Sequence, residues 1–122
     1  MIYYPIQTLV KAGVEDILIV VGGPHAGDFI KVLKNGKEFG INHMEFAYQE
    51  SGDGGIADAL RLAEDFADDE SIVVILGDNC TDADISTQVK NFNDGVVIFL
   101  KEVEDPQRFG IVVLNEDGSI AE

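Results

Sequence analysis

Apolar residues follow two different spacings along this chain, and the two spacings alternate. Short continuous apolar runs, clearest at residues 16–21 and 71–76, are typical of strands buried on both faces. Helical spacing is clearest over residues 56–67, where six apolar positions line one face: Ile56, Ala59, Leu60, Ala63, Phe66 and Ala67. Because helices alternate with strands, the pattern predicts a three-layer α/β domain with a mainly parallel sheet.

The remaining elements are marked by weaker signals. We expect further helices along the apolar positions of residues 2–10, 29–33 and 85–92, and further strands at 43–48, 95–103 and 109–114. Gly13 is placed to end the first helix. The turn Asn115–Gly118 leads into a last strand beginning at Ser119, and the segment from residue 95 onward either extends the sheet or begins a small antiparallel one. With no linker or internal repeat, residues 1–122 are predicted to form a single domain.

Composition and charge narrow the function classes. The chain has 122 residues, 46% of them apolar, and a net charge of −15, which argues against disorder and against binding to nucleic acid. No apolar run approaches the roughly 20 residues of a membrane span, and residues 1–5 do not resemble a signal peptide. The single cysteine, Cys80, has no partner for a disulfide. These features predict a cytoplasmic protein without a membrane partner.

A carboxylate follows one of the predicted buried strands. Gly77, Asp78 and Asn79 come directly after residues 71–76, and ligands bind at the carboxyl ends of strands in open α/β sheets. Asp78 is therefore a candidate ligand for Mg²⁺, which prefers carboxylate oxygens and bridges phosphates. Asn79 is a candidate partner for a sugar hydroxyl. The alternative is a simple turn, since all three residue types favour turns.

Candidate binding residues also follow the strand at 43–48. Gln49 can donate and accept hydrogen bonds, so it can read the edge of a pyrimidine, although an exposed loop glutamine is the more common case. Gly54 and Gly55 remove side chains where a base or sugar must come close to the backbone, and they also suit a tight turn. Gly110 allows a similar approach of a sugar.

Several blocks, in order, resemble the sugar-phosphate nucleotidylyltransferases, and within them the glucose-1-phosphate thymidylyltransferases. The blocks are residues 1–5, 16–19, 25–29, 36–40, 49–60, 76–79 and 105–110. The resemblance implies a Rossmann-like nucleotidyltransferase core. It also implies nucleotide binding by Gln49, Gly54 and Gly55, sugar binding by Asn79 and Gly110, and Mg²⁺ binding by Asp78. The implied partners are a nucleoside triphosphate and a sugar 1-phosphate.

The chain lacks the glycine-rich G-G-x-G-T-R-L loop of that family, with its catalytic Arg and Lys, and the second metal-binding Asp. We therefore expect a truncated, partial domain with no catalytic residue of its own. Two function classes stay open. One is a part of an enzyme that transfers a nucleotidyl group from dTTP, or another triphosphate, to a sugar 1-phosphate and releases pyrophosphate. The other is a non-catalytic remnant that binds a nucleoside or sugar, or serves as an assembly module.

The resemblance also has an architectural consequence. In the family a strand, absent here, runs between those matching residues 16–21 and 71–76, and unpaired buried backbone groups are costly. We expect one of two repairs: either residues 17–21 and 72–76 pair directly, or a strand from another chain fills the gap. The second repair predicts a homo-oligomer.

Overall fold

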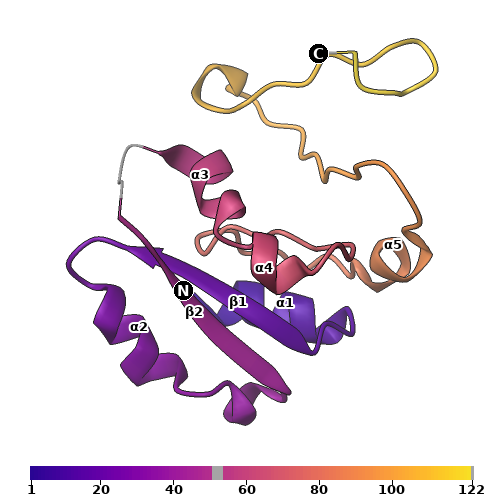
Figure 1. Ribbon diagram of the computed structural model, residues 1–122. Helices are drawn as coiled ribbons and strands as arrows, with labels where there is room; N and C mark the ends of the chain where they lie inside the picture. The colour runs from indigo at the N-terminus through magenta and orange to yellow at the C-terminus, as the bar shows by residue number, and fades with distance from the viewer. Residues whose placement is uncertain (51–53, 122) are drawn as a thin grey trace. The chain divides into compact units, whose positions relative to one another are not determined.

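A computed structural model of the chain describes residues 1–50 and 54–121 (Figure 1). It divides into two compact units, Met1–Phe92 and Asn93–Glu122, and each is described by itself. The predicted loop between Gln49 and Gly55 includes residues 51–53, which lie outside the described residues. The prediction of a single domain over 1–122 stays a prediction.

The first unit is built around a β–α–β arrangement. Strand β1, Asp16–Gly22, pairs in parallel with β2, His43–Gln49, from Asp16 opposite His43 to Gly22 opposite Gln49. The two strands lie side by side in Figure 1, with α2 in the connection between them. The other elements of this unit are α1 (Tyr3–Lys11), α2 (Ala26–Leu33), the 3₁₀ turn η1 (Lys37–Phe39), α3 (Gly55–Arg61), α4 (Glu64–Ala67) and α5 (Ser86–Asn91).

Helix α1 ends as predicted, at a glycine with positive φ. Gly13 has φ +91°, a conformation that costs glycine nothing. Its N–H donates to the carbonyl of Val10 at 3.0 Å, and the N–H of Val14 donates to the carbonyl of Leu9 at 3.1 Å. This pair of bonds is a Schellman motif, and it satisfies carbonyl groups that the helix leaves without partners. After this motif the backbone changes direction and continues into β1.

The core of the first unit packs α1 and α2 against β1. Alternation along β1 buries Ile17, Ile19 and Val21, while Leu18 and Val20 are half-buried. The buried cluster adds two residues of α1, the last residue of α2 and one residue shortly after η1: Ile6, Leu9, Leu33 and Ile41. Burial of such side chains contributes about 1.5–3 kcal/mol each, which makes this cluster the main source of stability in the unit.

Three of the predicted strands are not formed in this structure. The only sheet among the described residues has two strands, and the segments 71–76, 95–103 and 109–114 lie outside it. Direct pairing of residues 72–76 with β1 is wrong, because β1 pairs with β2 alone in the described part. An apolar run forms a strand only where a neighbouring strand supplies hydrogen-bond partners. Within the described ranges, the runs 71–76 and 95–103 pair with no strand, and the run 109–114 has only an isolated bridge between Leu114 and Ile120.

A cavity of about 1090 Å³ lies where that pairing was expected. Its lining includes residues 16–20 of β1 and residues 71–77, together with the apolar face predicted for residues 56–67. That face belongs to α3 and α4 in place of one continuous helix, and none of its residues is buried. The break is consistent with an apolar face that borders a cavity and has no packed layer to hold it straight.

The second unit has little regular structure in its described residues. A 3₁₀ turn, η2, spans Pro106–Arg108, and one antiparallel bridge joins Leu114 to Ile120. The turn predicted at Asn115–Gly118 is confirmed, since the N–H of Gly118 donates to the carbonyl of Asn115 at 3.0 Å. The apolar residues 96–100 are all exposed, Val96 by 80%. The described part of this unit therefore has no core of its own.

No helix in the described residues is both long enough and apolar enough to cross a membrane.

Candidate functional site

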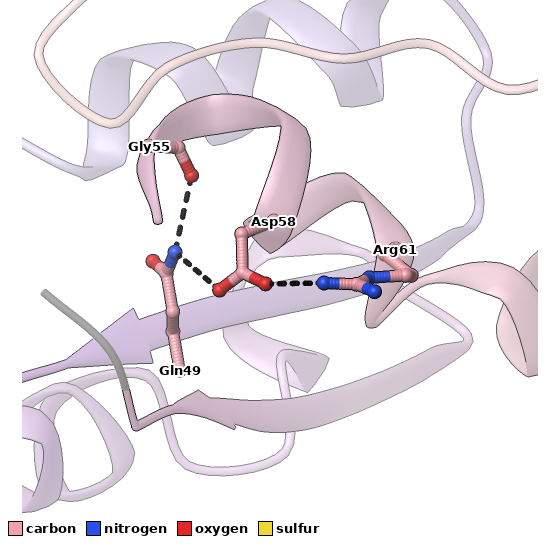
Figure 2. Close-up of polar contacts among 4 residues, drawn as sticks. All are labelled: Gln49, Gly55, Asp58 and Arg61. Atoms are coloured by element: carbon pink, nitrogen blue, oxygen red, sulfur yellow. Dashed lines mark hydrogen bonds and ion pairs between the residues drawn. The ribbon is translucent and has the colours of Figure 1, made fainter. Parts of the chain in front are cut away.

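Gln49 lies at the carboxyl end of β2, and its side chain is held in place by two hydrogen bonds. Its Nε2 donates to the carbonyl oxygen of Gly55 at 3.0 Å and to Oδ2 of Asp58 at 3.1 Å. Figure 2 shows the amide nitrogen between these two acceptors, with the amide oxygen turned away from them. The side chain predicted to read a pyrimidine is therefore tied to the start of α3.

Asp58 is the centre of this cluster. Its Oδ1 accepts a hydrogen bond from Nη2 of Arg61 at 2.9 Å, one turn further along α3 (Figure 2). The hydrogen bond from Gln49 lowers the pKa of the Asp58 carboxyl, and the hydrogen bond from Arg61 lowers it further, against a smaller opposing effect of desolvation. Asp58 is thus held ionised, and its Oδ2 accepts from Gln49 while its Oδ1 accepts from Arg61.

The contact between Gln49 and Asp58 was not predicted from the sequence. An Asp followed three residues later by an Arg on a predicted helix indicates only an ordinary surface ion pair. The Arg61 side chain is 76% exposed, as expected for such a pair, but that of Asp58 is only 27% exposed. The missed signal is that a glutamine at the end of a strand stands nine residues before an acid on the following helix.

The two glycines before the helix differ in what surrounds them. A Cβ on Gly54 would lie 2.5 Å from Oδ2 of Asp58 and 2.6 Å from its Cγ, so the missing side chain makes room for Asp58. Gly55 has φ +66°, and a Cβ placed on it would meet no atom within 4 Å. Of the two, only Gly55 leaves space for a base or sugar next to its backbone.

Residues from two of the predicted site segments line the same cavity. Gln49 and Gly55 belong to its lining, and so do Leu76 and Gly77, which directly precede Asp78. The volume of about 1090 Å³ is at the upper end for small-molecule pockets, because the cavity continues along β1. The structure thus brings the segment of Gln49 and the segment of Asp78 to one cavity.

Asp78 and Asn79 form the turn that the sequence offered as the alternative. The N–H of Asn79 donates to the carbonyl of Leu76 at 3.0 Å, and Nδ2 of Asn79 donates to Oδ1 of Asp78 at 3.3 Å. Both residues are exposed. Within the described ranges, no group of three His, Cys, Asp or Glu side chains is placed to hold a metal ion. Asp78 offers one carboxylate, which fits a Mg²⁺ ion only when substrate phosphates supply further ligands.

Gly110, the predicted sugar-site glycine, lies in the second unit. It is exposed, and a Cβ there would meet no atom within 4 Å. Its role stays a prediction.

Residues 1–122 match the nucleotidyl transferase family over their whole length. The chain belongs to this family. A glucose-1-phosphate thymidylyltransferase of Neisseria meningitidis is 35% identical over 96% of the chain, which covers 41% of that relative. A low-salt glycan biosynthesis nucleotidyltransferase of Haloferax volcanii is 31% identical over 98% of the chain, covering 34% of that relative.

A solved structure agrees with the family assignment. The crystal structure of a protein assigned as a glucose-1-phosphate thymidylyltransferase from Bacillus anthracis, in complex with sucrose, is 38% identical and superposes with a TM-score of 0.90. The match covers 99% of this chain and 49% of the other. The resemblance and the α/β nucleotidyltransferase fold class are thereby confirmed. The chain spans less than half the length of each of these relatives.

Proposed function

We propose that this chain forms the nucleoside-binding part of an enzyme that transfers a nucleotidyl group from dTTP, or another nucleoside triphosphate, to a sugar 1-phosphate, releasing pyrophosphate. The observation that carries the proposal is the fixed amide of Gln49 at the carboxyl end of β2. It lies beside Gly55 in a cavity whose lining also includes Gly77. Similarity to relatives named as glucose-1-phosphate thymidylyltransferases supports the choice of reaction.

The described residues supply binding groups for this reaction. Gln49 and Gly55 offer hydrogen-bonding groups and space for a base, and Asn79 and Gly110 are the candidates for the sugar. Mg²⁺, when bound, would neutralise phosphate charge, and Asp78 is the residue that would hold it. With a net charge of −15, the chain depends on such a cation to bind an anionic substrate. We place this reaction in the cytoplasm.

The test is a titration of the 122-residue chain with dTTP and Mg²⁺, followed by amide NMR shifts. We expect binding of about millimolar affinity, a free energy near −4 kcal/mol, with shifts at residues 49–50, 54–57 and 76–80. Gln49→Leu should weaken binding, whereas Gln107→Leu in the second unit serves as the matched control. Shifts confined to other regions, or equal affinities for both variants, would rule out this site.

A further inference from the structure

We propose that Asp58 is a positioning residue for the base: by holding the amide nitrogen of Gln49, it leaves Gln49 to read the base through its oxygen alone. The inference rests on the proposed function, because it concerns the same nucleoside site. Its consequence is a preference for bases that present an N–H group toward Gln49, as uracil and thymine do at N3.

The first step concerns the two hydrogens of the Gln49 amide. A side-chain amide has two donor hydrogens on nitrogen and an acceptor oxygen. Nε2 of Gln49 has two acceptors within hydrogen-bond distance, the Gly55 carbonyl at 3.0 Å and Oδ2 of Asp58 at 3.1 Å. Both hydrogens are thus used within the protein, and Oε1 remains for a ligand.

The second step is that the amide cannot turn over. Rotation by half a turn would place Oε1 against a carbonyl oxygen and a carboxylate oxygen, neither of which has a hydrogen to donate. Asp58 cannot easily provide one, since its hydrogen bonds with Gln49 and Arg61 lower the pKa of its carboxyl. In Figure 2 the amide oxygen points away from both acceptors. The orientation is therefore set by Gly55 and Asp58 together.

The third step is that Gly54 keeps Asp58 in this place. A Cβ on Gly54 would lie 2.5–2.6 Å from three atoms of the Asp58 side chain, including its Cβ. Because Cβ is fixed to the helix backbone, the conflict cannot be relieved by rotating the carboxylate alone. Gly54→Ala should therefore displace Asp58 without altering its chemistry, which gives a second, independent way to release the amide.

The fourth step is the chemistry of the base. The N3–H of uracil or thymine can donate to Oε1 of Gln49. A pyrimidin-2-one base has an acceptor at N3 and no N–H at all, so its N3 would face the amide oxygen without a hydrogen between them. Such an unmade bond costs about tenfold or more in affinity. Once Asp58 no longer accepts from the nitrogen, one of the two amide hydrogens has no partner in the protein, and Nε2 can donate it to the same N3.

The experiment compares uridine 5′-monophosphate with the 5′-monophosphate of pyrimidin-2-one riboside, two ligands that share sugar and phosphate. Each is titrated into the 122-residue chain, and the amide shifts of residues 54–57 are followed. For the unaltered chain we expect the uridine nucleotide to bind about tenfold more tightly. Asp58→Leu and Gly54→Ala should reduce this ratio to within about twofold. If Asp58 had a purely structural role, its substitution would weaken the binding of both nucleotides equally and leave the ratio of their affinities unchanged.

Asp28→Leu is the matched control. Asp28 is an exposed helical Asp that pairs with Lys31 three residues later at 3.1 Å, as Asp58 pairs with Arg61, and its substitution removes the same charge. It should leave the tenfold ratio in place. If the unaltered chain discriminates and both site variants keep its ratio, Asp58 does not position the base. If neither nucleotide shifts residues 54–57, the proposed function itself fails, and this inference falls with it.

Discussion

Gly22 of β1 and Gln49 of β2 face each other at the carboxyl ends of the two parallel strands. They lie so close that a side chain on Gly22 would touch the backbone of Gln49. A Cβ built on Gly22 lies 3.1 Å from the carbonyl oxygen of Gln49. The backbone at Gly22 does not have positive φ, so this close approach, and not the conformation of residue 22, favours glycine there. The residue that binds the base in our proposal therefore depends on a glycine of the neighbouring strand.

Gly22→Ala should push the ends of β1 and β2 apart by a few tenths of an ångström. We expect a loss of about 1 kcal/mol in the free energy of unfolding, with amide shifts centred on Gln49 and weaker nucleotide binding. Urea unfolding and the dTTP titration measure these effects. Gly27→Ala is the control, because Gly27 lies within α2 with open space at its Cβ, and alanine should stabilise a helix there by about 0.5–1 kcal/mol. Equal effects of both substitutions would refute the close approach as the cause.

The sequence predicts local elements well where they carry their own signals. The strand β1, the glycine that ends α1 and the position of Gln49 at the end of β2 all follow from patterns within a few residues, although β1 alternates between buried and half-buried positions where burial on both faces was expected. Residues 71–76 carry an equally clear strand pattern, yet a strand also needs a neighbour, and the pattern does not say whether one is present. The role of Asp58 was hidden for a related reason. A helical acid followed by an Arg looks the same whether its other oxygen faces water or Gln49.

Ile6 of α1 is fully buried, at 1% exposure, and it joins the helix to the core cluster. Ile6→Ala should lower the free energy of unfolding by about 2–5 kcal/mol, because it removes buried methyl groups and leaves a cavity. For a small domain this is a large part of the total stability. Urea unfolding followed by circular dichroism measures it. Ile30→Ala in α2, where the side chain is 48% exposed, should cost less than about 1 kcal/mol. Similar losses for both would contradict the assignment of the core.

The base preference should depend on pH through Asp58. Its pKa is lowered, first by the hydrogen bond from Gln49 and then by that from Arg61. A lowered pKa means that the contact is fully present above the ordinary range of an Asp, about 4, and is lost as the pH falls through the lower value of the folded state. The ratio of uridine to pyrimidin-2-one affinity should thus be constant from pH about 7 to about 4 and fall below that. A ratio that already declines above pH about 5, while the amide spectrum stays folded, would point to another group.

We expect the unpaired edge of β1 to pair with a strand from a second copy of the chain. Among the described residues β1 pairs only with β2, and its other edge borders an apolar cavity lined by residues 72–76. Unpaired strand edges recruit strands from other chains. We expect a concentration-dependent dimer in sedimentation experiments. Val74→Lys, at a cavity position that is 55% exposed, should weaken it at least about tenfold. Val97→Lys, 52% exposed in the second unit, is the control. A chain that stays monomeric up to about millimolar concentration would contradict the pairing of β1 with a strand from a second copy.

The purified 122-residue chain should not catalyse nucleotidyl transfer by itself. Reactions of this kind rely on positioned charge stabilisation more than on covalent help. In the first unit, Arg61 is the only arginine, and it is engaged by Asp58. Asp78 supplies one carboxylate, and in the part of the chain that the structure describes no group of three or more His, Cys, Asp or Glu side chains is placed to hold a metal ion. Loss of one preorganised stabilising group costs about 2.7–4 kcal/mol, or roughly 10²–10³ in rate, and several such losses together should bring turnover below detection.

Pyrophosphate release from dTTP and glucose 1-phosphate with Mg²⁺ is the assay, and binding of dTTP under the same conditions shows that the chain is folded and able to take up nucleotide. Robust turnover that disappears in Asp78→Ala would overturn this prediction, since it would mean that residues described here as structural supply the missing charge.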